Sequence, residues 1–196
     1  MPRIVDHDQR REELARHVWQ LTRQRGLEGV TLRSLSEVSG WSSGAIRPYL
    51  PHRESILSFA ATQLRGQTER RLRSVDLNGA PRENLERFLL ALLPTDEESR
   101  AITDVWLAFA VAAMRGENYA DSHGVLYAEL RALFLQIMES FEQGGWLPDR
   151  SAQQAATELH ALVDGLAVHL LMRQITLEAA EACIRAVVER MLRAPA

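Results

Sequence analysis

Lysine is absent from this chain of 196 residues, and cysteine occurs only once, as Cys183. A single cysteine excludes a disulfide framework and a cysteine-based zinc site, and it fits a reducing compartment. The N-terminal stretch has no apolar signal core, and the longest apolar run, Val105 to Met114, is too short to span a bilayer. We therefore expect a cytoplasmic protein that does not enter a membrane.

Strand patterns and two kinds of binding or catalytic motif are also missing. No segment alternates apolar and polar residues for long enough to predict a strand, and no internal repeat is visible. The chain has no glycine-rich phosphate-binding loop and no Glu-x-x-His pairs of the kind that bind two irons in a helical bundle. We therefore expect no catalytic residues, no metal, no cofactor and no enzyme activity.

Charge is present but unevenly distributed. The net charge is −3, yet residues 1–73 contain 13 Arg against 8 acidic residues, whereas residues 74–196 contain 10 Arg against 18. A basic N-terminal third followed by an acidic remainder is typical of a small DNA-binding domain attached to a larger domain that does not contact DNA phosphates. Arginine can bind phosphate or guanine through two hydrogen bonds, although a genome rich in G·C would also explain the missing lysine.

The stretch from Thr31 to Leu57 predicts two short helices around a tight turn, followed by a third helix. Thr31 and Ser42 are candidate N-caps, and Gly40 suits the left-handed residue that ends the first short helix. This order is the helix-turn-helix pattern, and an ordinary helical hairpin is the alternative. The second short helix carries small and hydrogen-bonding residues opposite its apolar side, which favours a close approach to a DNA groove.

The same stretch resembles the motif of the tetracycline-repressor (TetR) family of transcription regulators, through Thr31, Gly40, Ser42, Gly44, Tyr49, Arg53 and Leu57. The preceding residues resemble the betaine-regulator subgroup, which responds to choline. Four positions depart from the family pattern. Ser36 replaces an alanine, Trp41 a small β-branched residue, Pro48 a histidine and Leu50 an aromatic residue.

We expect operator contacts from both short helices and from the start of the next. Arg47 is the only long donor in the second short helix and is the best candidate for a guanine edge or a phosphate. Pro48 should end or distort this helix and bias Arg47 away from helical geometry. Trp41 packs either on the DNA backbone or on the first helix. The full set is Thr31, Arg33, Trp41, Ser42, Ser43, Gly44, Ala45, Arg47, Tyr49 and Arg53.

Apolar spacing predicts an all-α fold of about nine helices. Besides the two short helices, the predicted helical stretches are 9–25, 53–73, 82–93, 96–115, 121–143, 151–173 and 177–193. The uniformly apolar run from Val105 to Met114 predicts a fully buried helix. We expect a helix-turn-helix domain over 1–52, a connector helix over 53–73 and a ligand-binding and dimerisation domain over 74–196, with a linker from Ser74 to Pro81.

The last two predicted helices are apolar over more than one face, which favours a four-helix interface between two copies of the chain. The resemblance implies the same homodimer, and a monomer closed by its last helix is the alternative. The expected interface residues are Leu159, Leu162, Val163, Leu166, Leu170, Ile184, Val187, Val188 and Met191.

The resemblance also implies a small-molecule effector pocket in the C-terminal domain. Aromatic, soft or polar residues on apolar helices are the candidates, although each is also an ordinary core residue type: Trp106, Phe109, Met114, Tyr127, Phe134, His160, Asp164 and His169. We expect a repressor that an effector releases from a palindromic operator. One alternative is a dimeric regulator without a ligand. The other is a helical-bundle enzyme or ligand carrier whose helix-turn-helix domain is vestigial.

Overall fold

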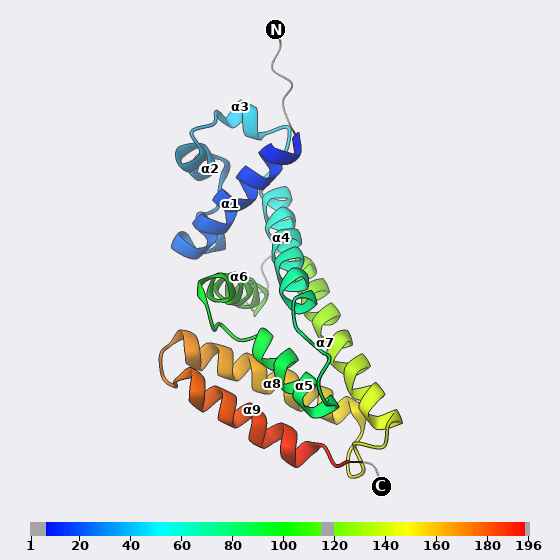
Figure 1. The fold of residues 1–196 in the computed structure, drawn as a ribbon. Helices are drawn as coiled ribbons and strands as arrows, with labels where there is room; N and C mark the ends of the chain where they lie inside the picture. The colour runs from blue at the N-terminus through cyan, green and yellow to red at the C-terminus, as the bar shows by residue number, and fades with distance from the viewer. Residues whose placement is uncertain (1–6, 115–119, 195–196) are drawn as a thin grey trace. The chain divides into compact units, whose positions relative to one another are not determined.

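The structure, a computed structural model, describes residues 7–114 and 120–194, and this part of the chain contains helices and turns but no strand (Figure 1). The predicted all-α fold class is therefore confirmed. The helices are α1 (His7–Arg25), the 3-10 helix η1 (Leu27–Gly29), α2 (Leu32–Ser39), α3 (Ser43–Ile46), α4 (Arg53–Arg73), α5 (Pro81–Ala91), α6 (Glu97–Met114), α7 (Ala120–Gln143), α8 (Ala152–Leu171) and α9 (Leu177–Met191).

Helix ends follow local signals in the sequence. Ser151 caps α8 by accepting a hydrogen bond from the Gln154 amide, and Thr176 caps α9 in the same way through the Ala179 amide. Gly145, with φ 75°, takes up the left-handed conformation just after α7. The predicted helix ends agree with the structure to within two residues, and the predicted linker lies between α4 and α5.

The described residues form two compact units. One contains residues up to 67 together with 104–114 and 120–124, and the other contains 68–103 and 125–194. The units are discontinuous in sequence because α4, α6 and α7 each contribute to both. The functional division predicted from the sequence, with its linear boundaries at 52 and 74, remains a prediction.

The first unit is built on α1, which contacts α2 and η1, while α2 contacts α3. Apolar side chains at helical spacing on α1, such as Leu14 and Leu21, are fully buried. In this unit, the expectation that the Val105–Met114 run is buried throughout is wrong: Val111 is 41% exposed and Met114 79%. Helical geometry turns only one side of such a run inward, and here that side carries Val105 and Phe109.

The second unit has one apolar core shared by α5, α7, α8 and α9. Contacts join α5 to α9 and α8 to α9, and the last pair runs antiparallel in orange and red in Figure 1. Within this core the rings of Phe88 and Phe134 meet edge to face, with centroids 5.4 Å apart.

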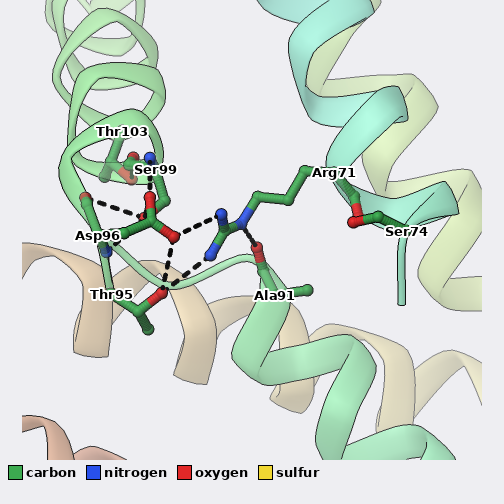
Figure 2. Close-up of polar contacts among 7 residues, drawn as sticks. All are labelled: Arg71, Ser74, Ala91, Thr95, Asp96, Ser99 and Thr103. Atoms are coloured by element: carbon green, nitrogen blue, oxygen red, sulfur yellow. Dashed lines mark hydrogen bonds and ion pairs between the residues drawn. The ribbon is translucent and has the colours of Figure 1, made fainter. Parts of the chain in front are cut away.

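A polar corner of the second unit joins the end of α4 to the segment between α5 and α6 (Figure 2). The Arg71 guanidinium donates to Ala91 O at 2.6 Å, to Thr95 Oγ1 at 2.8 Å and to Asp96 Oδ2 at 2.8 Å. Asp96 in turn caps α6, because its Oδ1 accepts the Ser99 amide hydrogen at 2.8 Å. One arginine thus fixes the last turn of α4 against the end of α5 and the start of α6.

Candidate DNA-binding motif and ligand site

The helix-turn-helix predicted from the sequence is present in α2, the turn at 40–42 and α3. Thr31 and Ser34 form a reciprocal capping box, in which each side-chain oxygen accepts the other residue's amide hydrogen, at 3.1 and 2.9 Å. Gly40 ends α2 with φ 70° and ψ 5°, the left-handed conformation that favours glycine. Ser42 Oγ then caps α3 by accepting the Ala45 amide hydrogen at 3.2 Å.

The stretch Gly40–Gly44 also fits the G-x-S-x-G spacing of hydrolase nucleophiles. That motif needs a strand before the serine, whereas α2 precedes Ser42 here. The hydroxyl of Ser42 serves as a helix cap, and the match carries no catalytic meaning.

The second short helix is a single turn. α3 ends at Ile46, and turns continue from Arg47 to Tyr49, in line with the predicted effect of Pro48, which has no amide hydrogen to donate. The expectation that Pro48 moves Arg47 out of helical geometry is wrong, since Arg47 has φ −53° and ψ −36°. The Tyr49 and Leu50 amides both bond to Ile46 O, and this turn holds Arg47 in the right-handed region.

One side of this motif is buried and the other is open. Ile46 and Leu50 are 0% and 2% exposed, whereas Ser42, Ser43, Gly44 and Arg47 are exposed. Arg47 forms no ion pair with any residue of the described part. A Cβ added to Gly44 would meet no atom closer than Ser42 Oγ, at 3.9 Å, so the fold itself does not require glycine here.

The candidate arginines on either side of α3 have partners within the chain. Arg33 forms a 3.2 Å ion pair with Glu37 one turn later on α2, and Arg53 donates to Glu28 O at 3.3 Å. Arg33 keeps 91% of its side chain exposed, so the pair leaves it open to another partner. Trp41 packs against the first helix, one of the two placements expected for it, with the Arg10 guanidinium carbon 4.9 Å from its ring centroid.

Four of the eight effector candidates come together in the second unit. The His160 ring is stacked between Tyr127, with centroids 4.8 Å apart, and Phe134, at 4.9 Å. Its Nε2 is buried and forms no hydrogen bond with any described residue, and Asp164 Oδ2 lies 3.8 Å from it. The His160 imidazole edge and the Asp164 carboxylate therefore lie beside a short aromatic stack. The Asp164 side chain is 39% exposed.

Burial shifts both titratable groups of this cluster toward their neutral forms. Loss of solvent lowers the pKa of His160, opposed by the charge of Asp164 and aided by that of Arg131. Burial likewise raises the pKa of Asp164, and His160 opposes that shift. The cluster therefore tends to hold a neutral imidazole next to a carboxyl group that is harder to ionise than usual.

Of the other four effector candidates, only His169 shares the second unit with this cluster. Trp106, Phe109 and Met114 belong to the first unit, where Phe109 is fully buried. His169 lies exposed in the last turn of α8. No group of three or more possible metal ligands occurs in the described residues, and none of the described helices is long and apolar enough to cross a membrane.

Comparison with known proteins identifies the architecture. Residues 81–193 match the family model of the C-terminal part of BetI-type transcriptional repressors. The regulator PksA of Bacillus subtilis, described as a helix-turn-helix type, is 31% identical over 176 residues, which cover 88% of this chain and 83% of that protein. The chain belongs to the TetR family of transcriptional regulators.

A BetI regulator is also similar in sequence to this TetR-family regulator, and a solved structure is similar in fold. The BetI regulator of Paraburkholderia xenovorans is 26% identical over 170 residues, covering 85% of this chain and 84% of that protein. A solved regulator of Saccharomonospora viridis, in complex with choline, superimposes with a TM-score of 0.82 at 22% identity, covering 95% of this chain and 98% of that one. The predicted class of protein is confirmed, and the enzyme alternative is not supported, because these relatives are transcriptional regulators.

The apolar residues expected at a dimer interface are mostly used inside the chain of this TetR-family regulator. Seven of the nine are buried in the core of the second unit, from Leu159 and Val188 at 0% exposure to Leu166 at 9%. Only Leu162 and Val187 remain partly exposed. The excess apolar surface that suggested an interface on α8 and α9 is therefore largely covered by α5 and α7 of the same chain.

Sequence reasoning missed two features of these sites. Ser34 completes the capping box of α2, but the pattern usually signals itself through Glu or Gln at that position. The stacking of His160 between two aromatic rings depends on the packing of α7 against α8, which spacing along one helix does not reveal.

Proposed function

We propose that this regulator binds operator DNA through α2 and α3 and represses transcription from it. The observation that carries the proposal is the exposed face of α3, where Ser42, Ser43, Gly44 and Arg47 are open while Ile46 on the opposite side anchors the helix. Short side chains allow a helix to approach base edges closely, and Arg47 supplies a bidentate donor. Arg33 and Arg53 add positive charge for the phosphates.

The charge distribution supports this proposal. The 13 Arg in residues 1–73 outnumber the 8 acidic residues there, although the whole chain is acidic. Such a domain is attracted to DNA, whereas the acidic remainder is repelled from it. A regulator of this kind works where the chromosome lies, in the cytoplasm.

We propose that the functional species is a homodimer on a palindromic site. Regulators of this family act as dimers. Two copies of α3 about 34–36 Å apart would reach successive major grooves on one face of the duplex. Of the nine residues expected at an interface on α8 and α9, Leu162 and Val187 are partly exposed and so remain able to contact a second copy.

We propose that a small effector binds beside Tyr127, His160 and Asp164 and lowers operator affinity. The aromatic stack and the nearby carboxylate suit an organic cation, because ring faces and negative charge both attract one. The choline in the Saccharomonospora viridis relative points to the same ligand class. Such a ligand changes operator affinity only through different affinities for the two dimer states.

The DNA proposal is tested by selecting bound duplexes from a random pool. The affinity of the protein is then measured for the selected duplex and for a duplex with the same bases in shuffled order. We expect affinity to fall steeply between about 50 and 200 mM salt, because phosphate contacts release counterions. Arg47→Ala should remove the preference for the selected site, whereas Arg185→Ala, which removes an exposed arginine of α9, should not. Retention of the preference in Arg47→Ala would rule out this role for Arg47.

The effector proposal is tested on the same complex with choline as the first probe. Choline should weaken binding to the selected duplex in the unchanged protein and have less effect in Asp164→Asn. Glu189→Gln removes a carboxylate from the exposed surface of α9 and is the matched control. If choline and other small organic cations leave operator affinity unchanged, the regulator without a ligand is the better description.

A further inference from the structure

Trp41 lies where three elements of the helix-turn-helix meet. Its amide nitrogen donates to Ser39 Oγ at 3.2 Å, and its carbonyl oxygen accepts from Ser36 Oγ at 2.6 Å. Both serines belong to α2. The backbone of the residue that immediately precedes the α3 cap is therefore held at both of its polar atoms by the preceding helix.

The side chain of Trp41 extends these connections to α1 and to the far end of α3. Arg10 of α1 lies over its ring at 4.9 Å, a cation–π arrangement. Tyr49, in the turn after α3, lies 6.4 Å away between ring centroids, tilted by 55°. Trp41 and Tyr49 thus stand at the two ends of α3 and contact each other.

The recognition helix needs such support because it is too short to be stable alone. A single helical turn fixes several residues for very few hydrogen bonds, and Pro48 contributes no amide hydrogen to extend it. Ile46 anchors α3 on its buried side. The direction in which Ser42 to Arg47 point is then set by what holds the two ends of the helix.

Two departures from the TetR-family pattern are joined by one of these contacts. Ser36 stands where the pattern has alanine, and Trp41 stands where it has a small β-branched residue. An alanine at position 36 would leave the Trp41 carbonyl oxygen without its 2.6 Å hydrogen bond. Ser36 therefore holds the backbone at position 41, and the tryptophan ring adds the contacts to Arg10 and Tyr49.

We propose that Trp41 is a positioning residue for operator recognition, which orients α3 through Ser36, Arg10 and Tyr49 and does not contact DNA itself. This inference rests on the proposed function and reassigns a residue that the sequence placed among the DNA contacts. A residue of this kind affects which bases are read, because it moves Ser42 to Arg47 together. It does not change the number of phosphates neutralised.

The test compares Trp41→Val, Ser36→Ala and Arg10→Ala with Arg11→Ala, which removes the same charge from the adjacent exposed position of α1. Affinity is measured for the selected duplex and for a shuffled one over a range of salt concentrations. We expect the first three changes to reduce the ratio of the two affinities, by about tenfold for Trp41→Val, comparable with the loss of one base contact. For Trp41→Val and Ser36→Ala the slope of affinity against salt should stay unchanged.

The same variants are compared without DNA, by amide hydrogen exchange. The Ile46 and Arg47 amides, which close α3 on Ser42 and Ser43, should exchange faster in Trp41→Val and Ser36→Ala. The Leu35 amide in α2 should not change, which separates a local effect from global unfolding. Arg10→Lys keeps the cation and should restore much of the discrimination lost in Arg10→Ala.

Three results would overturn the proposal. The first is a slope of affinity against salt that falls by about 1 in Trp41→Val, because such a change marks a lost phosphate contact. The second is an unchanged ratio of the two affinities. The third is unchanged hydrogen exchange of the α3 amides. If the unchanged protein prefers no duplex at all, the proposed function fails. The exchange measurement then still decides whether Trp41 positions α3.

Discussion

Arg71 donates a hydrogen bond from Nη1 to Oδ2 of Asp96 at 2.8 Å, and this pair ties the last turn of α4 to the residue before α6 (Figure 2). The other carboxylate oxygen of Asp96 caps α6 through the Ser99 amide. One carboxylate thus serves a helix cap and an ion pair together. The Ser99 amide, followed by Arg71, lowers the pKa of Asp96 from 3.8 to about 2.

The first prediction concerns the acid sensitivity of this pair. The pKa of Asp96 is lower in the folded chain than in the unfolded one. The ionised carboxylate therefore contributes fully to the free energy of unfolding above pH 3.8, and this contribution is lost as the pH falls toward about 2. Asp96→Asn keeps a capping side chain but removes the charge. We expect it to cost about 1 kcal/mol or less at pH 6, since the Asp96 side chain is half exposed.

Urea unfolding of both proteins at several pH values checks this prediction. The difference in unfolding free energy between the unchanged protein and Asp96→Asn should shrink between pH 4 and pH 2.5. Glu97→Gln, in the first turn of the same helix, is the matched control for a lost carboxylate. A difference that stays constant over this range would mean that the charge of Asp96 contributes nothing.

Gly44→Ala separates DNA recognition from folding. Alanine favours a helix over glycine by up to about 1 kcal/mol, and nothing lies within 3.9 Å of the added methyl group. The melting temperature should therefore stay the same or rise slightly. Affinity for the selected duplex should fall, because the added methyl group lies on the exposed side proposed to approach the bases. Unchanged DNA affinity would show that this part of α3 keeps its distance from the groove.

Local signals in the sequence predict the helices well, and contacts between distant residues explain what they do not predict. Thr31, Gly40 and Ser42 set the ends of α2 and α3 through their own hydrogen bonds and backbone angles. The partners of Trp41 and His160 come from other helices, and no spacing rule along one helix identifies them. Seven of the nine residues predicted for an interface on α8 and α9 are buried in the chain's own core, because apolarity does not distinguish that core from a second copy.

The third prediction concerns that interface. Leu162→Glu introduces a charge on a partly exposed residue of α8, and a charge facing its copy in a symmetric dimer would be desolvated and repelled. We expect sedimentation to show a shift from dimer to monomer. Leu77→Glu changes a residue that is 50% exposed between α4 and α5 and should leave the dimer intact. Equal sedimentation of both variants, with unchanged circular dichroism, would place the interface elsewhere.

The last prediction uses the buried imidazole. Because the pKa of His160 is lower in the folded chain than its usual 6.5, the unfolded chain takes up a proton more readily, and stability should fall as the pH drops from 7 to 5. His160→Phe keeps a flat ring between Tyr127 and Phe134 and removes the titrating group. We expect the variant to lose this part of the pH dependence, measured by urea unfolding.

A change at Asp164 should alter the pH dependence of stability in the direction opposite to His160→Phe. The carboxylate raises the pKa of His160 against the effect of burial, so Asp164→Asn should lower that pKa further and steepen the fall in stability between pH 7 and 5. His169→Phe, which removes an exposed histidine from the same helix, is the matched control. If His160→Phe retains the full slope of the unchanged protein, the pH dependence arises from other groups and His160 is not buried as a neutral ring.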